Sequence, residues 1–308
     1  MDFKKLTRLL IPLIVEGVLT VRRNSQHRLI EKLHELEFCT RKIEKTETEI
    51  TIELQILDVD LLYQLLAGEA NKFLLASRLS LDRSTQHQAK NASWQTVEHY
   101  YAAYYAAHYL IRLTGISLTN LDSNATNAVT KNFCEFSQAT VPNGLYLLSY
   151  DVPTQTLTLR KNLKKGYGGS HQDAWQLWVK LVEKLSEATS SDPVEYAATS
   201  VELIEHKNFL LKSNGKFNPP EIRGEINYQF KGGAWIFEKN AEGSIRRQQQ
   251  AIIDPQSQGA INLPSPEGLI FNNKIIIGLA KAVFTHSSHN YPRSICRSLA
   301  NKYANYVA

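Results

Sequence analysis

The chain has 308 residues, of which 43% are hydrophobic and 21% charged, with a formal net charge of +5. This length fits one or two domains, and the hydrophobic share supplies a packed core, which excludes wholesale disorder. The modest positive charge permits contact with nucleic acid or another acidic partner, whereas a dedicated DNA-binding domain concentrates more charge.

Cysteine usage argues against a metal site. Cys39, Cys134 and Cys296 form no CxxC pair and no zinc-ligand spacing. The sequence also lacks a P-loop, a GxGxxG turn, a serine-hydrolase elbow and an HExxH motif. We therefore expect reduced thiols, no metal and no other cofactor.

An apolar run from Leu9 to Val21 raises the question of a membrane segment. Pro12 and Glu16 interrupt the run, which is shorter than the roughly 20 residues that span a bilayer. A basic stretch at 22–28 follows where a signal peptide would have a cleavage site. The run therefore predicts a buried amphipathic helix in a cytoplasmic protein with no membrane contact.

The first 90 residues predict a small α+β module. Two helices are expected within 3–37, and strict apolar alternation over 48–57 predicts a half-buried strand. A short helix is expected over 61–66, with a restart after Gly68 as an option. The polar segment 80–92 is the best candidate for a domain boundary.

Residues 94–114 carry the strongest helical pattern in the chain. Tyrosines repeat on an alanine-rich backbone with few polar residues, which predicts a helix covered on most sides. The tyrosines are interpreted as core, although exposed tyrosines can also stack on bases. His99 and His108 lie on different parts of this helix, so we expect one to be buried and the other exposed.

The region after this helix mixes a hairpin with further helices. Residues 143–160 predict a β-hairpin, and a helix is expected to begin at Ser170, which has capping-box spacing to Asp173. Further helices are predicted over 193–211, 267–284 and 292–305. The whole is expected to be mainly α: a small N-terminal α+β module over 1–90, then a helical bundle over 93–308 with the inserted hairpin.

Three landmarks occur in order within the second part. They are the tyrosine helix at 100–115, the Gly-Ser-His-Gln-Asp-Ala-Trp segment at 169–175, and Arg-Gly-Glu-Ile-Asn-Tyr at 223–228. Together they resemble the HEPN superfamily of RNA- and nucleotide-associated helical bundles. The resemblance covers roughly 93–308, and the tyrosine helix carries most of it.

This resemblance implies a function. HEPN proteins form dimeric bundles in bacterial toxin–antitoxin and antiviral defence systems, and many are metal-independent ribonucleases with an Arg-x4–6-His motif. The arginine would hold the scissile phosphate while the histidine acts on the ribose hydroxyl or the leaving oxygen. RNA or nucleotide, a protein of a defence complex and a second copy of the chain are the implied partners.

The sequence departs from the family motif at its histidine. Tyr228 occupies that position after Arg223, and a phenol that titrates near 10 is a poor base at neutral pH. Arg223 and Asn227 either bind phosphate or fix helix packing. His171 lies at a predicted helix start near several lysines, a setting that suits phosphate, or it merely packs beside a capped helix.

We expect Arg223 and His171 to be the phosphate-binding and acid–base residues if the protein cuts RNA. The other candidate phosphate or nucleic-acid contacts are Asn227, Tyr228, Lys161, Lys164, Lys165, Arg22 and His27. The alternative is a non-catalytic adaptor subunit that contacts DNA through its basic stretches. A catalytic bundle would place Arg223 and His171 together in reach of solvent, whereas an adaptor would bury them or hold them apart.

Overall fold

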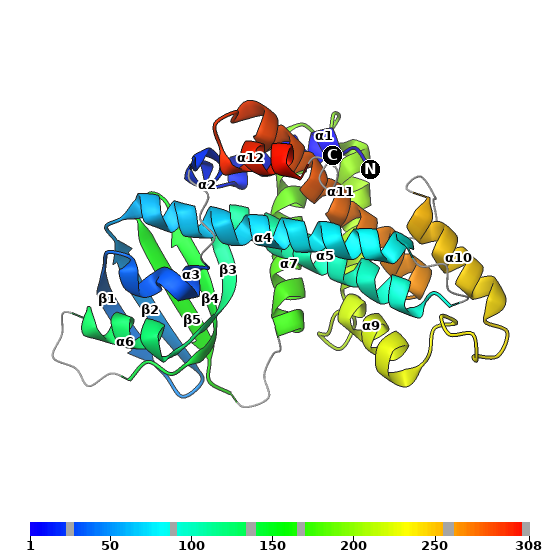
Figure 1. Cartoon of the computed structure of the whole chain (residues 1–308), viewed down its shortest axis with the longest axis horizontal. Coiled ribbons are helices and arrows are strands. Elements are labelled where there is room, and N and C mark those ends of the chain that lie inside the picture. Colours follow the sequence, from blue (N-terminus) through cyan, green and yellow to red (C-terminus); the bar gives the residue numbers. More distant parts are fainter. Residues whose placement is uncertain (23–27, 87–90, 134–139, 165–169, 255–261, 304–308) are drawn as a thin grey trace.

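The computed structural model describes residues 1–22, 28–86, 91–133, 140–164, 170–254 and 262–303 (Figure 1). An antiparallel sheet lies at one end of the molecule, a group of helices lies at the other, and two long helices connect them (Figure 1). The prediction of a mainly helical protein is confirmed.

Helices account for most of the described chain. The α-helices are α1 (Phe3–Leu10), α2 (Glu16–Thr20), α3 (Leu29–Lys32), α4 (Val59–Gln86), α5 (Ser93–Leu113), α6 (Ser123–Lys131), α7 (Ser170–Ala188), α8 (Ala197–Leu210), α9 (Asn218–Gln229), α10 (Glu242–Ile253), α11 (Pro266–Asn290) and α12 (Ile295–Lys302). The strands are β1 (Phe38–Lys45), β2 (Glu49–Ile56), β3 (Ile116–Leu121), β4 (Gly144–Asp151) and β5 (Thr156–Asn162).

The five strands form one antiparallel sheet in the order β1-β2-β5-β4-β3. The predicted hairpin is present as β4 and β5, which pair from Asp151 opposite Thr156. The predicted strand is present as β2, and its alternating isoleucines and leucine are fully buried. Ile52 of β2 lies opposite Leu159 of β5, so the sheet joins strands from both sides of the division expected near residue 90.

Helix α4 corrects the expectation of a short helix followed by a polar boundary. It runs without interruption through residues 80–86. Three serines near the end of this helix are buried: Ser77, Ser80 and Ser84 are at most 6% exposed. The Ser77 hydroxyl donates to the Ala102 carbonyl of α5 at 2.7 Å. The small serine side chains therefore let α4 and α5 approach closely. The polar pattern of this segment had instead predicted a linker.

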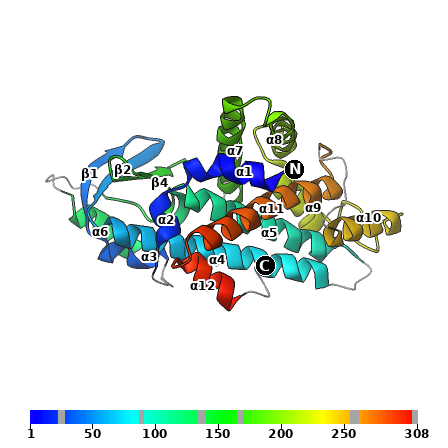
Figure 2. The same ribbon diagram turned by 90° about the horizontal axis from the view of Figure 1, so that it is seen from above.

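Helix α5 confirms the strongest prediction and is the centre of the bundle. It contacts α4, α7, α9 and α11, and Figure 2 shows α11 crossing beside it. His99 and His108 are both buried, so the expectation that one is exposed was wrong. Because α5 is covered on nearly every side, two histidines on different faces can both lie inside.

The apolar segments of the chain are packed inside the fold. The run from Leu9 to Val21 forms the end of α1, a 3₁₀ turn and α2, with Leu9, Val18 and Leu19 buried. Within the described residues, α11 alone is long and apolar enough to cross a membrane, and 61% of its apolar window is buried. Contacts with α1, α5 and α10 account for that burial.

Candidate functional site

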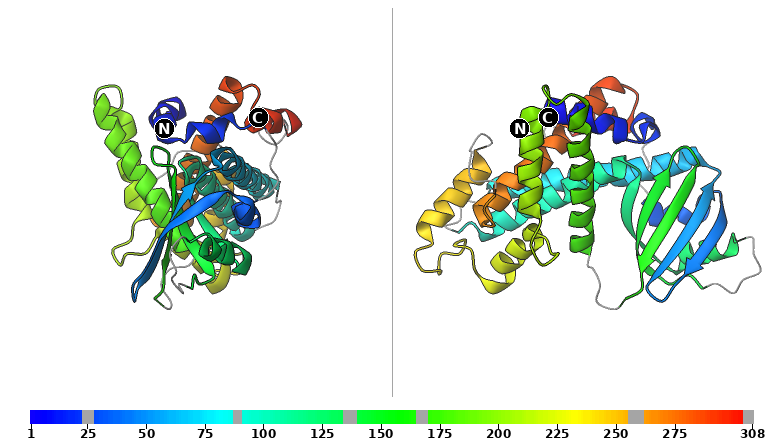
Figure 3. Two further views of the ribbon diagram at one scale, coloured as in Figure 1. Left: turned by 90° about the vertical axis from the view of Figure 1, so that its left-hand side faces the viewer. Right: turned by 180° about the vertical axis from the view of Figure 1, so that it is seen from behind.

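Arg223 and His171, the two residues singled out from the sequence, meet against the tyrosine helix. Helices α7 and α9 both pack on α5, and Figure 3 shows α7 beside α8, crossing the long helices. Arg223 Nη2 lies 3.4 Å from His171 Nε2 and donates to the Tyr101 hydroxyl at 2.8 Å. Arg223 and His171 are both half-buried, so each remains within reach of solvent.

Two aromatic residues hold the His171 ring from behind. The Tyr100 hydroxyl lies 2.8 Å from His171 Nδ1 and accepts from Trp175 Nε1 at 3.1 Å. A guanidinium only donates hydrogen bonds, so Nε2 must accept from Arg223 while Nδ1 carries the proton and donates to Tyr100. The lone pair of Nε2 therefore faces the guanidinium.

The surroundings of His171 keep its imidazole neutral. Burial lowers the pKa of His171, and the positive charge of Arg223 lowers it further. A neutral imidazole has one unprotonated nitrogen and can act as a general base at neutral pH. Burial also raises the pKa of Tyr100, which therefore stays a neutral phenol beside Nδ1.

The positive charge of Arg223 is not neutralised by an acidic residue. The groups acting on it are the tyrosines Tyr101, Tyr100 and Tyr228, and none of the described carboxylates forms an ion pair with it. Its Cζ lies 5.4 to 5.7 Å from those three ring centroids. Its Nε is buried without a hydrogen-bond acceptor among the described residues. A cation held by aromatic faces is free to bind an anion.

A second polar group lies deeper in the core. The Tyr104 ring is 4.5 Å from the rings of both His171 and His108, centroid to centroid. Arg112 Nη1 lies 2.8 Å from His108 Nδ1, and Arg112 Nε lies 3.1 Å from Glu69 Oε2. Burial and Arg112 hold the pKa of His108 well below its usual value. This buried ion pair ties α5 to α4 behind the site.

The remaining candidates on α9 are near the site. Tyr228 is 69% exposed, and its ring centroid lies 5.6 Å from Arg223 Cζ. It also lines a hollow of about 390 Å³ on the outer side of α9, together with Lys212 and Glu225. Asn227 is half-buried on the same helix.

The structure does not bring the basic candidates of the hairpin region to Arg223. Lys161 belongs to β5, where its Nζ donates to the Asn143 carbonyl and lies 5.5 Å from the centroid of the Tyr146 ring. Lys164 is exposed just after that strand. Both belong to the sheet end of the molecule, whereas α9 lies in the helical part (Figure 1). Lys165 lies outside the described residues.

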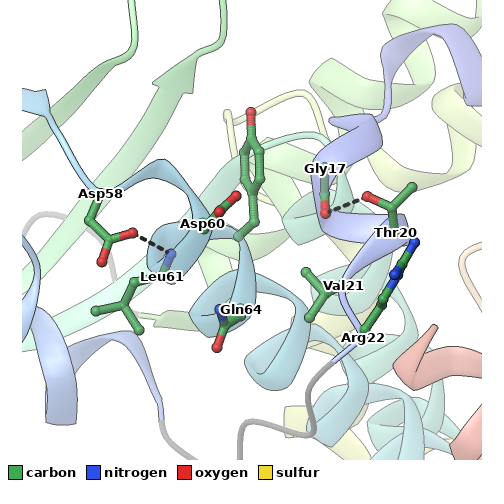
Figure 4. A pocket seen from close by; sticks show the side chains of 9 residues that line it. Gly17, Thr20, Val21, Arg22, Asp58, Asp60, Leu61 and Gln64 are labelled. Atoms are coloured by element: carbon green, nitrogen blue, oxygen red, sulfur yellow. Dashed lines mark hydrogen bonds between the residues drawn. The ribbon is translucent and has the colours of Figure 1, made fainter. Parts of the chain in front are cut away.

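Arg22 belongs to a different cavity, between α2 and α4 (Figure 4). This cavity measures about 700 Å³ and is lined by Gly17, Thr20, Val21, Arg22, Asp58, Asp60, Leu61, Tyr63 and Gln64. Asp58 is committed to capping α4, because its Oδ1 accepts from the Leu61 N–H at 2.9 Å. The cavity shares no lining residue with the Arg223 site. His27 lies outside the described residues.

The sequence led us to interpret the tyrosines as core, with stacking on bases as the alternative, and not as the surroundings of His171. Tyr100 and Tyr104 are indeed buried, yet their polar edges and ring faces surround His171. Their spacing carried the signal, since side chains at positions i, i+1 and i+4 of a helix gather on one side. Trp175, one turn after His171 on α7, is a further residue that the sequence did not single out.

No group of three or more His, Cys, Asp or Glu side chains within the described residues is placed to hold a metal ion. Comparison with protein-family models, with curated proteins and with solved structures gives no significant match. The resemblance to HEPN proteins therefore stays a prediction from the sequence landmarks, and the geometry around Arg223 and His171 carries the functional argument.

Proposed function

We propose that this protein binds the RNA backbone at Arg223 and cleaves it without a metal ion, as a HEPN-like component of a bacterial defence or toxin–antitoxin system. One observation carries the proposal. An arginine with no acidic partner among the described residues lies 3.4 Å from the Nε2 of a histidine whose pKa is lowered. The two residues come from different helices, 52 positions apart in the chain.

The geometry suggests how the reaction would proceed. A backbone phosphate would accept hydrogen bonds from the Arg223 guanidinium and displace its long contact with His171. His171 Nε2 would then take the proton of the ribose 2′-hydroxyl. The 2′ oxygen forms a bond to phosphorus, the bond from phosphorus to the 5′ oxygen breaks, and that oxygen takes a proton from water. The protonated His171 gives its proton to the hydroxide that this water leaves, which restores the neutral imidazole. The products are a 2′,3′-cyclic phosphate and a 5′-hydroxyl.

Each neighbouring side chain has a role in this scheme. Tyr100 holds His171 in the tautomer that leaves Nε2 free, as the orienting residue of a catalytic triad does. Arg223 stabilises the charge that develops on the phosphoryl oxygens. The attacking group is the 2′-hydroxyl, so RNA is the substrate and DNA can only bind.

The test is cleavage of mixed cellular RNA by the purified full chain in the presence of EDTA. We expect His171→Ala and Arg223→Ala each to lower the rate by at least about 100-fold. His289→Ala and Arg297→Ala, which alter exposed residues, should leave the rate unchanged. Products should end in a cyclic phosphate, and RNA methylated at the 2′ oxygen should bind without being cut.

The adaptor function is the second candidate, because Arg223 also fastens α9 to α5 through its hydrogen bond to Tyr101. If the wild type binds and cuts no RNA, and Arg223→Ala only lowers the melting temperature, the packing role is the correct one. Sedimentation of the wild type tests the homodimer that the HEPN resemblance implies.

A further inference from the structure

A group of four aromatic rings, three of them exposed, lies where α9 ends and α5 begins. We call it the aromatic platform, and it consists of Trp94, Phe230, Trp235 and Phe237. Trp235 and Phe237 are stacked with 5.4 Å between their centroids and 26° between their planes. Phe230 and Trp94 meet Trp235 edge-on at 5.3 and 6.3 Å. Phe237, Trp94 and Phe230 are 66%, 53% and 52% exposed.

The loop that carries the platform is held in place by specific hydrogen bonds. The Glu238 carboxylate accepts from the three backbone N–H groups of 233–235 at 2.8 to 2.9 Å. The Trp235 indole donates to the Ile226 carbonyl of α9 at 2.8 Å, and the Ala92 N–H donates to the Ala234 carbonyl at 2.9 Å. The exposed rings are therefore preorganised.

Phe230 has a backbone conformation that is unfavourable for any residue other than glycine. It follows the last residue of α9 with φ of 53°, in the left-handed region that favours glycine at helix ends. The strain brings it no burial, since half of its side chain faces solvent. Strained, exposed residues of this kind occur at ligand-binding sites more often than in the structural core.

The platform lies along the same helix pair as the phosphate site. Arg223 on α9 and Phe230 just after it are seven residues apart, as are Tyr101 and Trp94 on α5. At a rise of 1.5 Å per residue, both helices give a separation of about 10 Å. The exposed residue Tyr228, whose ring lies 5.6 Å from Arg223 Cζ, stands between Arg223 and Phe230 in the sequence. The platform is therefore about two helical turns from Arg223 along the same pair of helices.

The charge around the platform suits a polyanion. Lys231 and Lys239 are exposed on either side of the aromatic loop. The one acidic residue within the loop, Glu238, is occupied by backbone N–H groups. Flat aromatic faces flanked by cations are the arrangement with which proteins bind unpaired bases.

We propose that the aromatic platform stacks the bases of single-stranded RNA next to the phosphate held by Arg223. This inference rests on the proposed function, because Arg223 sets the path of the RNA backbone. It specifies the substrate as an unpaired segment, since the bases of a duplex are already stacked on each other and present no free faces. A protein partner is less well matched, because the surface combines aromatic rings with lysines and lies along the same helices as the phosphate site.

Equilibrium binding separates stacking from backbone contact. The probe is a short, fluorescently labelled single-stranded RNA methylated at its 2′ oxygens, which cannot be cut. A strand of equal length and charge without bases serves as its control. We expect Phe237→Ala and Phe237→Leu each to weaken RNA binding about tenfold and to leave binding of the abasic strand unchanged. Ile236→Ala, which alters an exposed aliphatic residue of the same loop, should bind like the wild type.

Phe230→Gly provides a variant that removes one ring of the platform and relieves backbone strain at the same time. Glycine relieves the left-handed strain at this position, so the melting temperature should stay the same or rise while RNA affinity falls. A loss of affinity in a protein that is at least as stable supports the platform directly. Unchanged affinity in this variant overturns it.

The outcomes distinguish the platform from the proposed function. If Arg223→Ala weakens binding but the Phe230 and Phe237 variants do not, the phosphate site stands and the platform falls. If neither Arg223→Ala nor the Phe230 and Phe237 variants change RNA binding, both proposals are refuted. If the Phe237 variants leave RNA binding intact but change the sedimentation of the protein, the rings form an interface with a second copy, and the platform is likewise refuted.

Discussion

Arg223 and His171 are far apart in the sequence and meet only in the folded protein. The charge of Arg223 and the protonation state of His171 depend on the residues around them. Arg223 has no acidic partner among the described residues, and Tyr100 fixes the tautomer of His171. In the sequence, Tyr228 stands where the linear motif would have a histidine after the arginine. In the structure, the histidine next to Arg223 is His171, which comes from a different helix.

The pKa of His171 tests this arrangement without requiring activity. Burial is the larger cause of its lowered pKa, and Arg223 is the second. Removing the charge in Arg223→Gln should therefore raise the pKa of His171 while leaving it below the usual value of about 6.5. Titration of the histidine ring signals by NMR measures the shift.

The control for this titration is Lys231→Gln, which removes an exposed positive charge near the end of the same helix. It should leave the titration of His171 unchanged. A pKa that does not move in Arg223→Gln would mean that the guanidinium and the imidazole are not in contact in solution.

At the scale of elements, the packing interface between α4 and α5, called the seam below, sets the position of the site. Small side chains on both helices allow the close approach, and the buried pair of Arg112 and Glu69 ties them together. Because Tyr100, Tyr101 and Tyr104 project from α5, a shift of this helix would move the groups that hold both Arg223 and His171.

Ser77→Leu tests the seam. The Ser77 hydroxyl touches the α5 backbone at Ala102, so a leucine there overfills the space and loses a hydrogen bond. We expect the free energy of unfolding to fall by about 1–3 kcal/mol, measured by urea denaturation. Thr85→Leu, at an exposed position of the same helix, should change it by less than about 0.5 kcal/mol. Equal effects of the two substitutions would contradict close packing at the seam.

At the scale of the whole molecule, one hydrophobic core extends from the sheet into the helices. Three buried histidines lie within the fold, and burial is the first cause of the low pKa of each. The pKa of His99 is lowered to about 3 and that of His206 to about 4, and the pKa of His108 lies well below its usual value. All three are neutral in the folded protein across the physiological range.

These histidines make the protein acid-sensitive. In the unfolded chain they titrate near pH 6.5, so below that pH the unfolded state binds more protons than the folded state and stability falls. From about pH 7.5 to about pH 5.5, the three together should lower the free energy of unfolding by up to about 4 kcal/mol. The penalty keeps growing until the pH reaches their folded pKa values.

Chemical denaturation at the two pH values measures this loss. His206→Gln should remove about one third of the pH-dependent loss, whatever its effect on stability at neutral pH. His289→Gln, which alters an exposed residue, should leave the loss unchanged. A stability that is constant over this range would show that the three histidines are not buried.

The local pattern of the sequence was sufficient for several elements. Alternation predicted β2, two strand-like runs around a turn predicted β4 and β5, and the apolar periodicity of 94–114 predicted α5. Ser170 was expected to begin a helix, and α7 begins there. These elements were predictable because their signals lie within a few neighbouring residues and do not depend on distant contacts.

Other elements could not be deduced in this way. The polar stretch that ends α4 looked like a linker, because serines are as suitable for a loop as for a tight helix contact. Pro219 and Pro220 stand in the first turn of α9, where proline is well tolerated, although a pair of prolines is equally typical of a turn. Strands β1 and β3 lack a strong pattern and depend on pairing with their neighbours in the sheet.

The sequence by itself determined the residue types of the site: an arginine, a histidine at a helix start and a helix rich in tyrosine. Only the tertiary structure decided that α7 and α9 meet on the same side of α5, which brings Arg223 to His171 and leaves Lys161 at the sheet. It also gathered Trp94 with the aromatic loop after α9. The physical reason is that periodicity records local burial, whereas a site is made by long-range packing, which no single segment encodes.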